Sequence, residues 1–385
     1  MRIAIVIPRY GSRVSGGAET QARGFAEAAS RRGWAVEVWT TCAHSHYTWE
    51  NIYPEGLSTE NGVFVRRFPV APWDRERKAF LETRLSTQGA LNPSEAYEWL
   101  ESGPHSPALY TYVTDHAAEW DVVIALPYAM PLIHYAVWAY PDRVVLWPCL
   151  HNEPYAYLEP VRLLLESADG VMFYSPEEAN LALYGLKVHP RRYAILGAGV
   201  PPPRSRTLPT RSLQGPYILY IGRLEEGKNV PLLYEYAQRY FNENQNVRLV
   251  VAGDGPARPP RHPAFVDMGF VTEGEKAALY RATLALCQPS LRESFSLTIM
   301  EAWLAGRPVL VHEDCEVTRG HVYRSKGGLW FRTYEEFAGA LDWLLTHPDL
   351  ATRMGENGKR YVLANYTWGT ILDRFERLIG RWKAW

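Results

Sequence analysis

The hydrophobic and polar positions of the chain form two kinds of segment, short apolar runs and longer stretches with helical spacing. The first run, residues 2–8, is rich in β-branched residues and ends in proline, which predicts a buried strand. Residues 18–32 then place apolar side chains on one helical face, and Gly33 stands where a helix would end. Residues 35–40 predict the next strand. Strand, helix and strand in this order form a βαβ unit, so we expect a parallel sheet.

The same alternation continues along both halves of the chain. In the first half, further buried strands are predicted over residues 63–68, 122–126, 144–148 and 171–174. In the second half, strands are predicted over residues 217–221, 247–252, 285–288 and 308–311. Helices are predicted there over residues 231–242, 273–281, 296–305 and 335–345, and again within 350–385. Residues 71–107 mix charges, proline and tryptophan, and we assign them to an inserted helical region.

A change in composition divides the chain into two domains. Residues 200–215 are rich in Pro, Arg, Ser and Thr, which is typical of a semi-rigid linker. We therefore predict an N-terminal domain over residues 1–199 and a C-terminal domain over residues 216–365. The predicted fold class is α/β, with two Rossmann-like domains facing a central cleft. Ligands of such sheets bind beyond the carboxyl ends of the strands.

Composition narrows the class of protein. The chain has 385 residues, of which 47% are hydrophobic and 22% charged, and this is a globular composition. The formal net charge of -1 lacks the basic excess of a nucleic-acid-binding protein, so we expect no nucleic-acid partner. Four scattered cysteines without a CxxC pair suit a reducing, cytoplasmic environment. No signal-peptide pattern and no apolar run of about 20 residues is found, while peripheral contact with the inner membrane face is left open.

The first candidate for chemistry is a pair of glutamates eight residues apart, Glu293 and Glu301. They flank the predicted start of a helix, where free backbone N–H groups and the helix dipole favour an anion such as a diphosphate. The residues that offer these N–H groups are Ser294, Phe295, Ser296 and Leu297. Glu293 could accept hydrogen bonds from sugar hydroxyls, and Glu301 from a ribose diol. The alternative is a charge at the helix start and a solvated helix residue.

The second candidate is a cationic loop that follows the strand predicted over residues 217–221. Gly222 and Arg223 end this strand, and Lys228 follows five residues later. Glycine lets the backbone approach a ligand closely, and two cations at a strand end would neutralise a departing diphosphate. The alternative is a polar loop with two surface cations.

Two further motifs lie in the predicted N-terminal domain. Gly16 and Gly17 open the first helix without the G-x-G-x-x-G pattern of a dinucleotide site, and their backbone could face a phosphate or an acceptor. His151 follows a strand end within the sequence His-Asn-Glu-Pro. A lone histidine is more often structural than catalytic, so this second motif is weak by itself.

A last motif in the C-terminal half consists of Gly253, which follows a strand, and a turn at Phe270 and Val271. Backbone groups in such a turn could hold a nucleobase by hydrogen bonds, with the aromatic ring beside them. The alternative is a simple turn.

In their order along the chain, these motifs resemble the retaining glycosyltransferases of the GT-B fold, family 4. The motifs are G-G-x-E, H-x-E-P, G-R-x4-K, A-G-x-G-P, G-F-V and E-x7-E, and they cover nearly the whole chain. The resemblance implies a nucleotide-diphosphate sugar, most of all a UDP- or GDP-sugar, as donor. It implies a glycan, lipid-linked glycan or small molecule as acceptor, which the sequence does not identify. It makes residues 1–199 the acceptor-side domain and residues 216–365 the nucleotide-sugar-binding domain, and the segment 366–385 would cross back to the N-terminal domain.

The resemblance also implies roles for individual residues. Arg223 and Lys228 would contact the diphosphate, Glu293 would hold the transferred sugar and His151 would lie near its anomeric carbon. The other implied donor-binding residues are Gly16, Gly17, Gly222 and Gly253, the base-binding turn Phe270 and Val271, Ser294 to Leu297, and the ribose-binding Glu301. No cofactor and no metal ion is expected, because no Asp-x-Asp pair is present.

Residues 312–328 depart from this pattern, since relatives often carry a Gly-Gly-x-x-Glu loop at that place. The alternative classes for this sequence are a GT-B nucleotide-sugar epimerase, a glycogen-type phosphorylase, a nicotinamide dehydrogenase and a non-catalytic nucleotide-sugar-binding partner protein. The chain shows no lysine signature for pyridoxal phosphate and no dinucleotide fingerprint.

Overall fold

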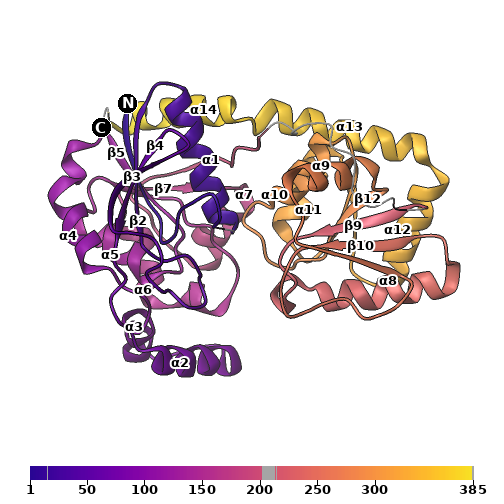
Figure 1. Ribbon diagram of the computed structural model, residues 1–385, viewed down its shortest axis with the longest axis horizontal. Coiled ribbons are helices and arrows are strands. Elements are labelled where there is room, and N and C mark those ends of the chain that lie inside the picture. Colours follow the sequence, from indigo (N-terminus) through magenta and orange to yellow (C-terminus); the bar gives the residue numbers. More distant parts are fainter. Residues whose placement is uncertain (15, 202–212, 214, 384–385) are drawn as a thin grey trace. The chain divides into compact units, whose positions relative to one another are not determined.

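The computed structural model describes residues 1–14, 16–201, 213 and 215–383, and the chain forms two compact units (Figure 1). The N-terminal domain consists of Met1–Gly199 together with the segment that begins at Trp368. The C-terminal domain is Val200–Thr367. Most of the predicted linker, 200–215, lies outside the described residues.

The N-terminal domain is built on an eight-stranded sheet with the order β3-β4-β2-β1-β5-β6-β7-β8. Its strands are β1 Arg2–Val6, β2 Ala35–Thr41, β3 Gly56–Glu60, β4 Val63–Phe68, β5 Val122–Ala125, β6 Val144–Leu146, β7 Gly170–Phe173 and β8 Tyr193–Ile195. Only the edge pair β3 and β4 is antiparallel. The strands β1, β5 and β7 are apolar and almost wholly buried, as strands of a helix-covered sheet require.

Helices connect these strands. They are α1 Gly17–Arg31, α2 Arg75–Gln88, α3 Pro93–Glu101, α4 Pro107–His116, α5 Pro131–Ala139, α6 Glu159–Ser167 and α7 Pro176–Asn180, with α14 Trp368–Lys383 from the end of the chain. Short helical turns lie at Ala117–Glu119, Pro154–Tyr157 and Leu181–Gly185. The helices α2 and α3 confirm the inserted helical region, and they project beyond the sheet and the helices that cover it (Figure 1).

The C-terminal domain contains a six-stranded parallel sheet with the order β11-β10-β9-β12-β13-β14. Its strands are β9 Tyr217–Ile221, β10 Arg248–Ala252, β11 Phe265–Gly269, β12 Ala285–Gln288, β13 Val309–His312 and β14 Gly328–Phe331. Its helices are α8 Val230–Asn244, α9 Glu273–Ala282, α10 Leu297–Leu304, α11 Glu316–Ser325, α12 Tyr334–Thr346 and α13 Pro348–Asn365, with a short turn at Glu226–Lys228. Two parallel α/β domains confirm the predicted fold class.

The strands that the sequence pattern did not predict are β3, β8, β11 and β14, and each of them is an edge strand of its sheet. An edge strand buries few side chains, so it does not need the apolar run that marks a central strand. Residues 312–328, which depart from the family pattern, contain helix α11, which the sequence pattern did not predict. No side chain caps the start of this helix and its interior holds Val317, Thr318 and Gly320, so the usual helix signals are weak.

Helix α14 is part of the N-terminal core although it ends the described chain. The ring of Trp368 packs so closely on Gly24 and Gly199 that a Cβ atom at either glycine would lie 2.3 or 2.2 Å from it. Phe375 meets Phe25 of α1 edge to face, with ring centroids 5.0 Å apart. These contacts explain why glycine stands at both positions, and they fix α14 against α1.

The inserted helices carry a buried lysine. Lys78 of α2 donates a hydrogen bond to the Trp99 carbonyl of α3 at 2.8 Å, and its Nζ atom lies 3.4 Å from the centre of the Trp99 ring. Burial lowers the pKa of Lys78 to about 7, and the nearby Glu82 only partly opposes this effect. The packed interior of the insertion therefore favours the uncharged amine.

We predict that replacing Lys78 with Met stabilises the chain at pH 7. The unfolded chain binds a proton on this lysine up to a pKa near 10.5, whereas the folded chain releases it near 7. Wild-type stability should therefore rise between pH 7 and pH 10, by up to about 1.4 kcal/mol per pH unit. Thermal unfolding of the wild-type protein and of Lys78→Met at pH 7, 8.5 and 10 should show that the variant is more stable at pH 7. This difference in stability should shrink as the pH rises. The same substitution at the more exposed Lys359 is the control, and an equal effect there would contradict the prediction.

Candidate active site

The candidate site of the C-terminal domain lies where its strand order reverses. Strands β10 and β11 follow on one side of β9, and β12, β13 and β14 follow on the other. The loops after β9 and β12 leave the sheet at this switch point, at the carboxyl ends of neighbouring strands, where ligands of open α/β sheets bind. The first loop carries Arg223 and Lys228, and the second carries Glu293.

Backbone contacts hold these loops in place. A Cβ atom at Gly253 would lie 1.8 Å from the carbonyl oxygen of Gly222, so the loops after β9 and β10 touch backbone to backbone. The side-chain amide of Asn229 donates to the carbonyl of Pro289 at 3.1 Å, which joins the loop after β9 to the loop after β12. Gly253 is thus required by packing, a reason that is independent of any ligand.

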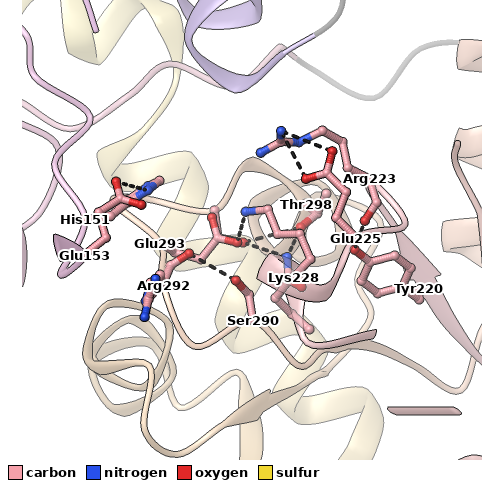
Figure 2. A network of polar contacts seen from close by, with 12 residues as sticks. His151, Glu153, Tyr220, Arg223, Glu225, Lys228, Ser290, Arg292, Glu293 and Thr298 are labelled. Atoms are coloured by element: carbon pink, nitrogen blue, oxygen red, sulfur yellow. Dashed lines mark hydrogen bonds and ion pairs between the residues drawn. The ribbon is translucent and has the colours of Figure 1, made fainter. Parts of the chain in front are cut away.

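Lys228 and Glu293 form an ion pair across the two loops, with 2.7 Å between Nζ and Oε1 (Figure 2). Only 10% of the Glu293 side chain and 19% of the Lys228 side chain are exposed. The structure therefore brings together the lysine of one predicted motif and the first glutamate of the other. The alternative of a plain surface cation does not fit Lys228.

Arg223 differs from Lys228 in its surroundings. Its guanidinium lies 3.2 Å from Glu225 Oε2, and 57% of its side chain is exposed. Figure 2 shows Arg223 turned toward Glu225 and Lys228 turned toward Glu293. Each cation thus has its own carboxylate partner, and Arg223 keeps the solvent access that binding an anion needs.

The start of α10 follows directly after Glu293. Ser296 is the residue before the helix, and its backbone has the left-handed φ of 69°, which is uncommon for any residue but glycine. No side chain caps the helix there, so backbone N–H groups of the first turn have no partner within the helix. Phe295 anchors this turn from within, edge to face with His321 and Tyr366. Strained backbone of this kind clusters at ligand-binding sites.

Glu301 lies on α10 and faces α9. Its Oε1 atom is 3.0 Å from Nζ of Lys276, and its Oε2 atom accepts a hydrogen bond of 2.9 Å from the hydroxyl of Tyr280. The alternative of a solvated helix residue is therefore wrong. The sequence analysis missed both partners, which stand 25 and 21 residues before Glu301 in a segment without a recognisable motif.

The predicted base-binding turn borders a pocket. The pocket has a volume of about 440 Å³. It is lined by Arg258, Asp267, Met268, Gly269, Phe270, Val271 and Glu275. Phe270 stands at its mouth with 81% of its surface exposed, and Arg258 pairs with Asp254 at 2.5 Å. Helix α9 begins directly after this turn with a capping box between Thr272 and Glu275, which fixes the turn to the helix. The simple-turn alternative leaves this pocket and the exposed ring unexplained.

In the N-terminal domain, helix α1 begins at Gly17, as expected. The carboxylate of Glu19 folds back over the helix start, so that a Cβ atom at Gly16 would lie 2.0 Å from it. Glu19 also pairs with Arg9. The anion-favouring end of α1 therefore already holds a carboxylate of this chain, and a phosphate there would have to compete with it.

His151 stands in the loop after β6, with its Nδ1 atom 3.5 Å from Glu153 Oε1 (Figure 2). Burial acts to raise the pKa of Glu153, but His151, Tyr155 and Tyr128 outweigh it, so this pKa lies below its usual range. The hydroxyl of Tyr128 donates to Glu153 at 2.8 Å. His151 is thus one member of a polar cluster, not an isolated core histidine.

The loop that carries His151 is held by a buried carboxyl group that the sequence analysis missed. Glu178 accepts the backbone N–H of Leu150 at 2.5 Å, and its other oxygen accepts the N–H of Tyr174. Burial raises the pKa of Glu178 to about 8, although the backbone donors oppose the shift. Helix α7 begins after Ser175, whose side chain accepts the N–H of Glu178, so the residue that anchors the loop is itself fixed by the helix cap.

Two kinds of feature are absent from the described residues. No group of three or more His, Cys, Asp or Glu side chains could hold a metal ion in the part of the chain that is described. Among the helices described, none is both long enough and apolar enough to cross a membrane.

Comparisons with known proteins agree with this architecture. Residues 215–347 match the family described as Glycosyl transferases group 1. The chain is 25% identical over 379 residues to a D-inositol 3-phosphate glycosyltransferase of Stackebrandtia nassauensis, covering 89% of this chain and 81% of that protein. It is 28% identical over 170 residues to the alpha-D-kanosaminyltransferase of Streptomyces kanamyceticus, covering 41% of this chain. The match spans 44% of the length of the kanosaminyltransferase. A second match, to a Xenopus tropicalis relative, spans 49% of that relative's length.

Solved structures share the whole fold. Sucrose-phosphate synthase from Thermosynechococcus elongatus superposes with a TM-score of 0.72 at 18% identity, covering 100% of this chain and 99% of that one. The Anabaena protein Alr3699/HepE, in complex with UDP and glucose, gives a TM-score of 0.70 at 16% identity and covers 99% of each chain. At such identities the likeness concerns the fold alone.

The fold is therefore that of the GT-B proteins, with two parallel α/β domains in one chain. The C-terminal domain, at residues 215–347, carries the signature of the group 1 glycosyl transferases.

Proposed function

We propose that this protein is a retaining glycosyltransferase that moves a sugar from a nucleoside-diphosphate sugar to a hydroxyl group of an acceptor. The observation that carries the proposal is the set of groups in the C-terminal domain. A pocket with an exposed aromatic ring, an anchored glutamate and a lysine–glutamate pair beside a helix start correspond to the base, ribose, diphosphate and sugar of such a donor. The solved complexes of Alr3699/HepE with UDP and with UDP-glucose support a donor of this class.

Each part of the donor has a binding group of matching chemistry. Phe270 offers a face for the base, and the backbone of Val271 offers polar groups beside it. Glu301 accepts hydrogen bonds from the ribose diol. Arg223 and Lys228 neutralise the diphosphate together with the N–H groups at the start of α10. We propose a UDP- or GDP-sugar as the donor.

In the reaction, the bond between the anomeric carbon and the diphosphate oxygen breaks while the acceptor oxygen bonds to the same face of the sugar. Negative charge grows on the leaving oxygen, where Arg223 and Lys228 stabilise it most. The leaving phosphate takes the proton of the acceptor hydroxyl, so no separate base is needed. Glu293 orients both the sugar and the Lys228 amine. His151 acts as a hydrogen-bond partner of the sugar.

We propose a glycan, a lipid-linked glycan or a small hydroxylated molecule as acceptor. The name of the Stackebrandtia relative, a D-inositol 3-phosphate glycosyltransferase, supports the small-molecule class. The competing functions are a nucleotide-sugar epimerase and a non-catalytic nucleotide-sugar-binding protein. An epimerase would convert the donor with no acceptor present.

The proposal is tested with UDP-, GDP-, ADP- and dTDP-sugars, first by calorimetry and then by product analysis with a panel of sugars and inositol phosphates. We expect binding of one donor class, transfer that survives EDTA, and an anomeric proton in the product with the donor's configuration. Transfer that requires added Mn²⁺ would contradict charge neutralisation by the two cations. A product with inverted configuration would contradict the reaction course.

A second prediction concerns the cations. Arg223→Ala or Lys228→Ala should lower kcat by about 100-fold to 1,000-fold, because one donor to a developing anion contributes about 2.7–4 kcal/mol. KM for the donor should change less, since the charge develops as the bond breaks. Arg239→Ala, which removes an exposed arginine of α8, is the matched control. A change confined to the acceptor KM would show that neither cation serves the diphosphate.

A third prediction separates the glutamates. Glu301→Gln should weaken binding of the free nucleoside diphosphate, because its role is at the ribose. Glu293→Gln should leave that binding within a few-fold and lower the transfer rate, because its role is at the sugar. Calorimetry with the free nucleotide and initial transfer rates measure the two effects, and the opposite pattern would exchange the two roles.

A further inference from the structure

We propose that Lys276 and Tyr280 are positioning residues that fix the carboxylate of Glu301, and that they thereby make the site select ribose over 2′-deoxyribose nucleotides. This inference rests on the proposed function, since it deepens the role of Glu301 at the donor. It assigns a purpose to two side chains of α9 that no sequence motif indicates.

The geometry separates the two oxygens of one carboxylate. Lys276 Nζ lies 3.0 Å from Oε1, and the Tyr280 hydroxyl donates to Oε2 at 2.9 Å. Lys276 and Tyr280 are four residues apart on α9, so they project from one helix face toward Glu301. Two donors on different oxygens leave the carboxylate no freedom to rotate. A single donor would leave that rotation open.

Both donors stay protonated, Tyr280 because it is buried and Lys276 because carboxylates surround it. Tyr280 is only 2% exposed, and burial together with the Glu301 charge raises the pKa of its hydroxyl well above the usual range. Burial alone would lower the pKa of Lys276, but the carboxylates of Glu301 and Glu273 outweigh it, so this pKa lies above its ordinary value. Both anchors therefore donate throughout the neutral pH range.

The anchored carboxylate still has acceptor positions for a ligand with two neighbouring hydroxyl groups. An ionised carboxylate offers about four acceptor positions, and Lys276 and Tyr280 occupy one on each oxygen. One position on each oxygen of Glu301 is left, at a fixed spacing. Two vicinal hydroxyls, such as the 2′ and 3′ hydroxyls of ribose, match this arrangement. A 2′-deoxyribose would leave one fixed oxygen without its partner.

Helix α9 also links this carboxylate to the base pocket. Glu275 lines the pocket, and the next residue is Lys276. The capping box of Thr272 and Glu275 joins the turn with Phe270 to the first turn of the helix. One rigid element thus sets the spacing between the base-binding turn and the anchor of Glu301, as recognition of a whole nucleoside requires.

Lys276 also contacts Glu273 at 3.1 Å, and this pair supplies the control. Glu273 belongs to the same helix and its side chain is largely exposed, so its ion pair with Lys276 is of the surface type that contributes little. If Lys276 served only such a surface network, Glu273→Gln and Lys276→Met would have similar effects. If Lys276 positions Glu301, Lys276→Met should change nucleotide binding and Glu273→Gln should not.

The experiment is calorimetry of the full chain with UDP and 2′-deoxy-UDP, and with GDP and 2′-deoxy-GDP. The wild-type protein should bind the ribonucleotide of its preferred base about tenfold to a hundredfold more tightly than the deoxynucleotide, as expected for one hydrogen bond to a charged group. Lys276→Met and Tyr280→Phe should weaken binding of the ribonucleotide and bring the ratio of the two affinities toward one. Lys276→Arg should restore part of it, and Glu273→Gln should leave it unchanged. Thermal unfolding shows that each variant is folded.

The outcomes separate this inference from the proposed function. Binding of no nucleoside diphosphate by the wild-type protein would overturn both. Nucleotide binding with equal affinity for the ribo and deoxy forms would overturn the inference and the ribose role of Glu301, and would leave the proposed glycosyl transfer standing. Variants of Lys276 and Tyr280 that lose affinity while keeping the wild-type ratio would overturn only the inference, since that result describes a loss of packing.

Discussion

The ion pair between Lys228 and Glu293 joins the two loops that leave the C-terminal sheet at its switch point. Both side chains are largely buried, and removing one partner of a buried pair leaves an uncompensated charge, at a cost of about 3–5 kcal/mol. The pair therefore ties the conformation of the loop after β9 to that of the loop after β12. Asn229 reinforces this tie through the Pro289 carbonyl. A ligand that changes the conformation of one loop therefore also changes that of the other.

How much of the fold the sequence could reveal depended on burial. Most central strands of the two sheets are apolar runs, because helices cover both faces, and these strands were predicted within a few residues. The edge strands β3, β8, β11 and β14 were missed because an edge needs no such run. Helix α11 was missed for a different reason, since Cys315, the residue before it, does not cap the helix start with its side chain.

For the candidate site, the sequence predicted residues that lie within one short motif and missed those that meet only after folding. The loop with Arg223 and Lys228 and the pair Glu293 and Glu301 are local patterns, and each could be seen within a dozen residues. The anchors of Glu301 could not, because Lys276 and Tyr280 reach it only through the packing of α9 on α10. The same holds for Glu178, whose link to Leu150 joins segments 28 residues apart. Contacts of this kind exist only in the folded chain.

The return of α14 to the N-terminal core has a consequence for the order of events during synthesis. The ribosome completes residues 1–199 long before it makes Trp368, whose ring fills the space over Gly24 and Gly199. Until then, the apolar face of α1 around Phe25 lacks its cover. The C-terminal domain, by contrast, is one continuous segment that can close on its own. The domain that is translated first therefore cannot complete its core until helix α14 has been made.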